Sequence, residues 1–147
     1  MTEQLANVLI VDDLEDDIYM TRRYLGEPRG MRCTFIEARD GKAALDKIRG
    51  LRATGQIIDL ILLDINMPIM NGFEMLTRMR EDPSLAGIPV VMQTGSTYDR
   101  DKERARTLGA VGYLEKPVQF AALTEILGVV RSIELVGSAP PSLLRTA

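Results

Sequence analysis

The sequence contains no histidine among its 147 residues. This absence excludes several kinds of site from the chain: a histidine general base, a Ser-His-Asp triad, a metal bound by histidine, and a phosphorylated histidine. Any histidine chemistry in which the protein takes part must therefore come from a partner.

Cysteine, basic clusters and long apolar runs are also scarce. Cys33 is the only cysteine, so an intramolecular disulfide is impossible and a cytoplasmic protein is favoured. No apolar run approaches the ~20 residues that cross a membrane, and the N-terminus lacks the features of a signal peptide. The net charge is -3 at pH 7, without a basic cluster for nucleic acid. We therefore expect a soluble, cytoplasmic protein that binds neither membranes nor nucleic acid.

Short apolar runs alternate along the chain with segments of helical periodicity. The runs lie at residues 8–11, 33–36, 60–63, 90–93 and 112–114, and the helical segments at about 16–25, 41–51, 72–82, 98–108 and 120–133. This alternation predicts an α/β fold, with a doubly wound five-stranded parallel sheet and five helices. We expect one domain over residues 1–134 and a C-terminal tail over residues 135–147.

Acidic residues follow two of the predicted strands. Asp12 and Asp13 come directly after the first run, and Asp64 ends the third. Thr94 and Lys116 follow the fourth and fifth runs in the same way. Because parallel strands present their functional residues at their carboxyl ends, we expect these side chains to meet at one edge. Three carboxylates there repel one another, so the arrangement requires a cation, and Mg2+ is suited to such ligands.

Asp64 is the candidate acceptor of a phosphoryl group. Phosphoryl transfer asks a protein mainly to position groups and to offset charge. Asp12 and Asp13 would hold Mg2+, while Asp64 supplies a metal contact and the attacking oxygen. Lys116 would pair with Asp64 and then with phosphate oxygens, and Thr94 offers a hydroxyl donor. Taken singly, each residue could be a cap, a turn residue or a surface charge, and only their joint order favours the site.

These motifs closely resemble the receiver domains of two-component response regulators over about residues 8–130. The matching segments are Asp12-Asp13, residues 63–72, Thr94-Gly95 and residues 112–117. The resemblance implies the flavodoxin-like fold of chemotaxis regulators. It also implies that Asp64 accepts phosphate from a sensor histidine kinase.

The resemblance further implies a set of roles for the site residues. The implied Mg2+ ligands are Asp12, Asp13, Asp64 and the backbone carbonyl of Asn66. Lys116 would contact the acyl phosphate, Thr94 and Tyr113 would form the switch, and the bond before Pro117 would be cis. The chain departs from the usual pattern at Gln93 and Gly95, and the positions that tune dephosphorylation in the family are here Asn66 and Ser96.

The end of the chain resembles stand-alone regulators that accompany phytochrome-type kinases. The likeness lies in residues 81–85 and 129–134, although the aromatic residues common after that point are replaced by aliphatic ones. In those relatives a C-terminal extension supports a homodimer. The resemblance therefore implies an apolar arm formed by Leu135, Val136, Leu143 and Leu144.

We interpret the chain as a single-domain response regulator, a phosphoacceptor with slow autodephosphorylation rather than a turnover enzyme. Its output would be protein contact or transfer of the phosphoryl group to a phosphotransfer protein. One alternative is a dimeric scaffold with a receiver fold that works without phosphorylation. Another is a haloacid dehalogenase-type phosphatase, which would need an Asp-x-Asp pattern on its first strand, but Leu14 stands two residues after Asp12.

Overall fold

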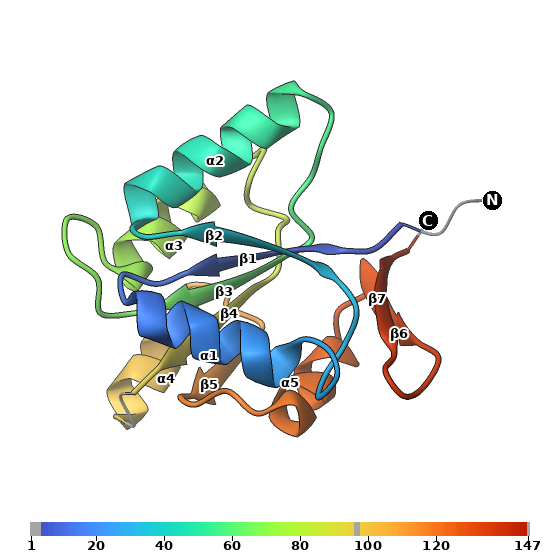
Figure 1. Ribbon diagram of the computed structural model, residues 1–147. Helices are drawn as coiled ribbons and strands as arrows, with labels where there is room; N and C mark the ends of the chain where they lie inside the picture. The colour runs from blue at the N-terminus through green and yellow to red at the C-terminus, as the bar shows by residue number, and fades with distance from the viewer. Residues whose placement is uncertain (1–3, 96–97, 147) are drawn as a thin grey trace.

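The computed structural model describes residues 4–95 and 98–146, and its centre is a parallel sheet between two layers of helices (Figure 1). The sheet has five strands in the order β2-β1-β3-β4-β5. The strands are β1 (Asn7–Val11), β2 (Thr34–Ala38), β3 (Leu60–Asp64), β4 (Val90–Thr94) and β5 (Gly112–Glu115). The helices are α1 (Glu15–Leu25), α2 (Gly41–Ala53), α3 (Gly72–Glu81), α4 (Asp99–Thr107) and α5 (Phe120–Leu127). The predicted doubly wound fold is confirmed.

Two apolar clusters lie on opposite faces of the sheet. One joins alternate residues of the strands to α2, α3 and Ala105 of α4. The other joins the remaining strand residues to α1 and α5. Every residue of β3 and β4 is buried, which explains why these strands read as continuous apolar runs in the sequence.

Side-chain caps fix where two of the helices begin. The Asp40 side chain accepts a hydrogen bond of 2.7 Å from the backbone N–H of Ala43 at the start of α2. Asn71 and Glu74 form a reciprocal capping box at the start of α3, with hydrogen bonds of 2.9 and 3.3 Å. These caps satisfy N–H groups that a helix leaves without partners, and so they help to set the length of the preceding loops.

The buried strand β4 contains one unusual polar residue. Gln93 is fully buried, and its side-chain oxygen and nitrogen have no hydrogen-bond partner in the described part of the chain. Its Cα is paired in register with that of Asp64 on β3. A buried polar group without a partner costs about 1–3 kcal/mol, so Gln93 lowers the stability of the strand next to Asp64.

The last helix is shorter than predicted, and the expected helix up to residue 133 is wrong beyond Leu127. Gly128 follows the helix, and two β-branched residues come next, which favours an end there. Ile133 instead begins a strand and is buried against the cluster that contains α1 and α5. Packing and strand pairing therefore override the apolar spacing on which the helix prediction rested.

Residues expected to form a tail fold into an antiparallel pair, β6 (Ile133–Val136) and β7 (Ser142–Arg145). The pair lies beside the amino ends of β1 and β2 (Figure 1). The backbone oxygen of Leu143 accepts a 2.8 Å hydrogen bond from Ala6, and its N–H donates one of 2.9 Å to Arg32. Leu143 and Leu144 are buried within this same chain, whereas Val136 is 39% exposed.

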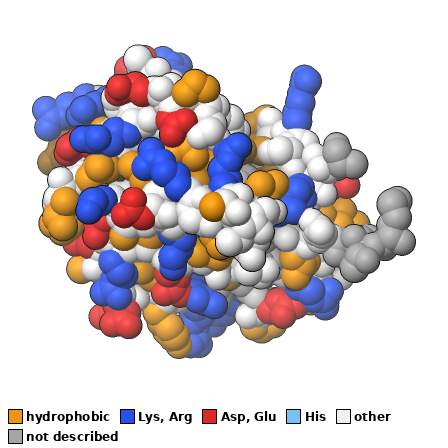
Figure 2. Space-filling model, turned by 90° about the horizontal axis from the view of Figure 1, so that it is seen from above, with side chains coloured by type: hydrophobic (Ala, Val, Ile, Leu, Met, Phe, Trp, Pro, Cys, Tyr) orange, Lys and Arg blue, Asp and Glu red, His pale blue; other side chains and the backbone are white. Residues whose placement is uncertain are grey.

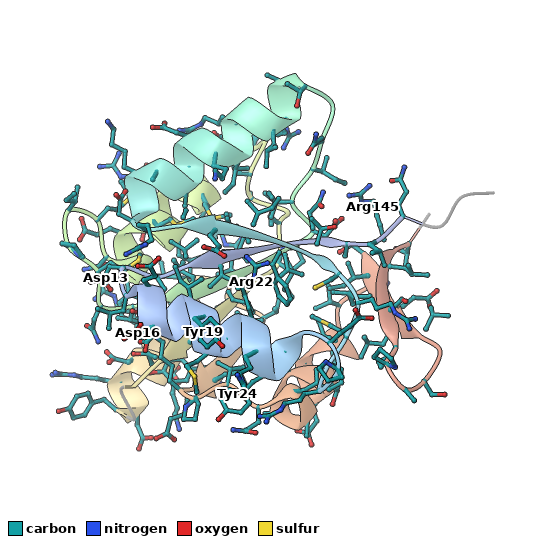
Figure 3. All side chains as sticks on the ribbon, in the orientation of Figure 1. Asp13, Asp16, Tyr19, Arg22, Tyr24 and Arg145 are labelled. Atoms are coloured by element: carbon teal, nitrogen blue, oxygen red, sulfur yellow. The ribbon has the colours of Figure 1, made fainter. Side chains whose placement is uncertain are left out.

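An ion pair attaches this hairpin to the sheet. Asp59 is buried, and it accepts hydrogen bonds of 2.7 and 2.9 Å from Arg145 and one of 2.7 Å from the backbone N–H of Asn7. Arg145, labelled in Figure 3, is the last residue of β7. The pair thus connects the end of the described chain to the amino ends of β1 and β3.

The outer surface carries charges of both signs. Figure 2 shows the face above α2, where basic side chains are interspersed with acidic and apolar ones. Among the helices of the described ranges, none is long and apolar enough to cross a membrane.

We expect Arg145→Met to lower the free energy of unfolding by about 2–4 kcal/mol, because it leaves the buried Asp59 carboxylate without its cation. Urea unfolding measures the change. Arg131→Met is the matched control, since Arg131 is exposed and lies in the same hairpin region. Equal stability of the two variants would contradict a role for the ion pair.

Candidate functional site

The carboxyl ends of the central strands meet at one edge of the sheet, where parallel α/β sheets bind ligands. β1 leads into Asp12, β3 ends at Asp64, β4 ends at Thr94, and Lys116 follows β5. The last three residues line a cavity of about 520 Å³ together with Asn66 and others. The structure therefore brings together side chains that lie far apart in the sequence.

Three carboxylates form a compact acidic cluster at this edge. Asp12, Asp13 and Asp64 each offer an oxygen, and these oxygens lie within 4.8 Å of one another. Asp12 is fully buried and Asp64 is 5% exposed, so water screens their charges poorly. The cluster is consequently a strong candidate for holding a cation.

The chemistry of the donors fits Mg2+. All three side chains are carboxylates, the hard oxygen ligands that this ion prefers, and the partly exposed Asp13 leaves room for the waters that it keeps. Asn66 lines the same cavity, and its backbone hydrogen-bonds to Asp64. A ligand role for the Asn66 carbonyl stays a prediction.

Lys116 provides the positive charge nearest to the cluster. Its Nζ lies 2.6 Å from Asp12 Oδ2, 2.8 Å from Asp17 Oδ2 and 3.4 Å from Asp64 Oδ2. Burial lowers the pKa of the ammonium, but the hydrogen bonds to Asp12 and Asp17 and the charges of Asp64 and Asp12 together outweigh burial and raise the pKa to about 12. Lys116 is therefore charged at every physiological pH.

The pKa of Asp64 is shifted in the opposite sense to that of an ordinary paired carboxylate. Burial and, to a smaller extent, the charge of Asp12 raise it against the lowering effect of Lys116, and the net result is a pKa of about 6 in place of 3.8. Repulsion and desolvation thus outweigh the single ammonium, which indicates a site that lacks positive charge.

The loop after Asp64 packs closely against it. The backbone N–H of Gly72 donates a 2.9 Å hydrogen bond to the carbonyl of Ile65. A Cβ at position 72 would lie 2.3 Å from the Asp64 carbonyl oxygen, so only glycine allows α3 to begin there. This contact fixes the backbone that carries the Asp64 side chain.

Thr94 and Tyr113, the two predicted switch residues, lie on β4 and β5. Thr94 is fully buried in the cavity wall, and its carbonyl accepts a 2.8 Å hydrogen bond from the backbone N–H of Lys116. Tyr113 is half-buried on β5, and the Lys102 ammonium of α4 lies 5.9 Å from its ring centroid. The Lys116–Pro117 peptide bond is cis. Switch roles for Thr94 and Tyr113 stay predictions, and Ser96 lies outside the described residues.

Sequence reasoning did not identify Asp17 as a residue of this site. It lies in the first turn of α1 and lines the cavity. No local signal could have found it, because α1 begins at Glu15 and the preceding acidic pair therefore shares no helix face with Asp17. Its bond to Lys116 could not be seen without the fold.

Comparison with known proteins agrees with the resemblance seen in the motifs. The model of the response regulator receiver domain family matches residues 8–128. Over 118 residues the chain is 36% identical to a probable cyclic di-GMP phosphodiesterase of Vibrio cholerae, covering 80% of the chain but only 25% of that protein. Over 121 residues it is 33% identical to the polar-differentiation response regulator DivK of Brucella anthropi, covering 82% of the chain and 92% of that protein.

Solved structures give the same result. The bacteriophytochrome response regulator RtBRR superimposes with a TM-score of 0.77 and 32% identity, covering 94% of this chain and 85% of that one. The bacteriophytochrome response regulator AtBRR gives a TM-score of 0.76 and 30% identity, covering 86% and 93% of the two chains. The chemotaxis protein CheY4 of Vibrio cholerae gives 0.70 and 32%, covering 86% and 98%. With its acidic edge, its fold and its matching family model, the chain belongs to the response regulator receiver domain family.

Proposed function

We propose that the protein is a response regulator of a two-component phosphorelay, which accepts a phosphoryl group on Asp64 from a sensor histidine kinase. One observation carries the proposal: a buried strand-end carboxylate lies beside two others and within 3.4 Å of a lysine ammonium. The chain has no histidine of its own, so the phosphohistidine must belong to the kinase. The protein is then a phosphoacceptor with slow autodephosphorylation rather than a turnover enzyme.

The transfer begins with the carboxylate oxygen of Asp64, which attacks the phosphorus of the kinase phosphohistidine. The P–N bond breaks, and its electron pair leaves with the imidazole nitrogen as the P–O bond forms. Bound Mg2+, held by Asp12, Asp13 and Asp64 with the Asn66 carbonyl, would offset the charge of the transferring phosphoryl oxygens.

The residues around Asp64 then adjust to the new charge. A phosphoryl group on Asp64 carries about -1.5 to -2 charges and three acceptor oxygens. The Lys116 ammonium then donates a hydrogen bond to these oxygens. The Thr94 hydroxyl donates to another oxygen, and Tyr113 responds on the neighbouring strand, which changes the protein-contact surface.

We propose a phytochrome-type sensor kinase as the donor. Support comes from the likeness to two bacteriophytochrome response regulators, at 30% and 32% identity over most of the chain. The changed surface would bind a target, or the phosphoryl group would pass to a phosphotransfer protein. We place these steps in the cytoplasm, where the single cysteine would stay reduced.

Direct labelling tests the acceptor. Incubation with acetyl phosphate and Mg2+ should add one base-labile phosphate, detected by intact mass, and Asp64→Asn should remove it. Asp46→Asn, a change at an exposed carboxylate on α2, should label like the wild type, and a chelator should abolish labelling. An unmodified wild type would favour the scaffold that needs no phosphorylation, and label on Asp64→Asn would place the acceptor elsewhere.

The stability of the metal-free protein should depend on pH through Asp64. Folding raises its pKa to about 6, so between pH 4 and 6 the folded state binds more protons and loses stability as the pH rises. The Asp64→Asn variant has no carboxylate at this position, so its free energy of unfolding does not fall in this way. In chelator, its advantage in unfolding free energy over the wild type should therefore be greater at pH 7.5 than at pH 4 by about 2 kcal/mol.

Urea unfolding at the two pH values measures this difference, with Asp46→Asn as the control for removing a carboxylate. The control should keep the same difference from the wild type at both values. An advantage of Asp64→Asn that does not change with pH would show that Asp64 ionises as freely in the folded protein as in the unfolded chain.

We also propose a homodimer formed through the C-terminal hairpin. Among the described residues β6 pairs with β7 alone, so its outer edge has backbone groups available to a second copy. Leu143 and Leu144 are buried in their own chain and Leu135 packs against its core, so the proposed contact falls on the exposed Val136.

Light scattering tests the dimer. The wild type should have the mass of a dimer, and Val136→Lys should have that of a monomer, because a charge would enter the apolar contact. Val129→Lys is the matched control, since Val129 is 73% exposed and lies outside the strands. A monomeric wild type, or a dimeric Val136→Lys, would refute this interface.

A further inference from the structure

Lys116 has a carboxylate partner that belongs to neither the acidic cluster nor the proposed phosphoryl chemistry. The Asp17 carboxylate lies 2.8 Å from Lys116 Nζ, closer than the 3.4 Å that separates Nζ from Asp64. Asp17 is not among the three residues whose oxygens could hold a metal together. Its contribution to the site must therefore act through the lysine or through its charge.

Asp17 occupies one of the N–H donors of Lys116. An ammonium group has three N–H donors, and here two of them bond to Asp12 and Asp17. Binding of a cation by Asp12 would release one donor. Nothing in the proposed chemistry releases the other, because Asp17 lies outside the cation cluster and keeps its hold on Lys116.

The position of Asp17 adds a second effect of the same sign. Asp17 lines the cavity that also contains Asp64 and Lys116. A phosphoryl group that approaches Asp64 through this cavity is anionic, and the Asp17 carboxylate repels it. Competition for the lysine and repulsion of the donor both oppose phosphorylation.

We propose that Asp17 is a positioning residue that restrains phosphorylation of Asp64 by holding Lys116 and by disfavouring free anionic phosphodonors. The proposal rests on the proposed function, since it concerns access to the same acceptor. Asp17, in the first turn of α1, would thus limit phosphorylation of Asp64 by small metabolites such as acyl phosphates. A kinase that brings the phosphoryl group on an imidazole, with its own surface charges, can offset the repulsion.

Kinetics with acetyl phosphate at saturating Mg2+ test the proposal. Asp17→Asn should raise kcat/KM for labelling about fivefold to tenfold, mostly through a lower KM, because the lost repulsion acts on the bound donor as well as on the transition state. Asp16→Asn is the matched control. Asp16 lies in the same turn, is exposed, and carries the same charge (Figure 3).

The lysine itself gives a readout that needs neither metal nor phosphate. In protein labelled with 15N-lysine, the Lys116 ammonium should give a protected signal, because it is 16% exposed and bonded to two carboxylates. Asp17→Asn should shift this signal and speed its hydrogen exchange, while Asp16→Asn should leave it in place. The same spectra show that both variants are folded.

The outcomes separate this proposal from the one on which it rests. If the wild type labels on Asp64 but Asp17→Asn and Asp16→Asn have equal kcat/KM, the restraint by Asp17 is overturned and the acceptor stands. An unmoved Lys116 signal in Asp17→Asn overturns the restraint as well. A wild type that does not label at all overturns both.

Discussion

The structure depends on an imbalance of charge at the carboxyl edge of the sheet. Three carboxylates, those of Asp12, Asp17 and Asp64, lie within 3.4 Å of the single Lys116 ammonium, and a fourth, that of Asp13, lies beside Asp12 and Asp64. Burial strengthens the repulsion that remains, and it raises the pKa of Asp64 to about 6. A site with this deficit of positive charge gains stability from any cation that it binds, which supports the Mg2+ and the phosphoryl chemistry that we propose for it.

The sheet makes this imbalance possible. The interior strands β1, β3 and β4 are hydrophobic on both faces, and their packing holds the carboxylates in place against repulsion. Gly72 lets α3 begin directly against the Asp64 backbone, which fixes the backbone that carries this carboxylate. The stability of the core thus offsets the repulsion between the carboxylates. Gln93, whose buried side chain has no hydrogen-bond partner in the described residues and which pairs with Asp64, is a second destabilising feature.

Most of the fold, and the meeting of Asp12 and Asp64 at one edge of the sheet, could be predicted from sequence, because they follow from local patterns. Apolar runs that end in Asp12 and Asp64 identify buried strands and the edge where their residues meet. Contacts between side chains that lie far apart in the sequence could not be predicted from local patterns. The bond from Asp17 to Lys116 joins residues that are 99 positions apart, and the pair of Asp59 with Arg145 joins residues 86 apart. The spacing of apolar residues after Leu127 fits a helix, but strand pairing decides the structure there.

The most direct test of the account is to locate the acyl phosphate after transfer from a phosphorylated phytochrome-type sensor kinase. Borohydride reduces an aspartyl phosphate to homoserine, and peptide mass spectrometry then identifies the position. We expect homoserine at position 64 and at no other carboxylate. Homoserine at position 12, 13 or 17, or none after the kinase has lost its phosphoryl group to the protein, would contradict it.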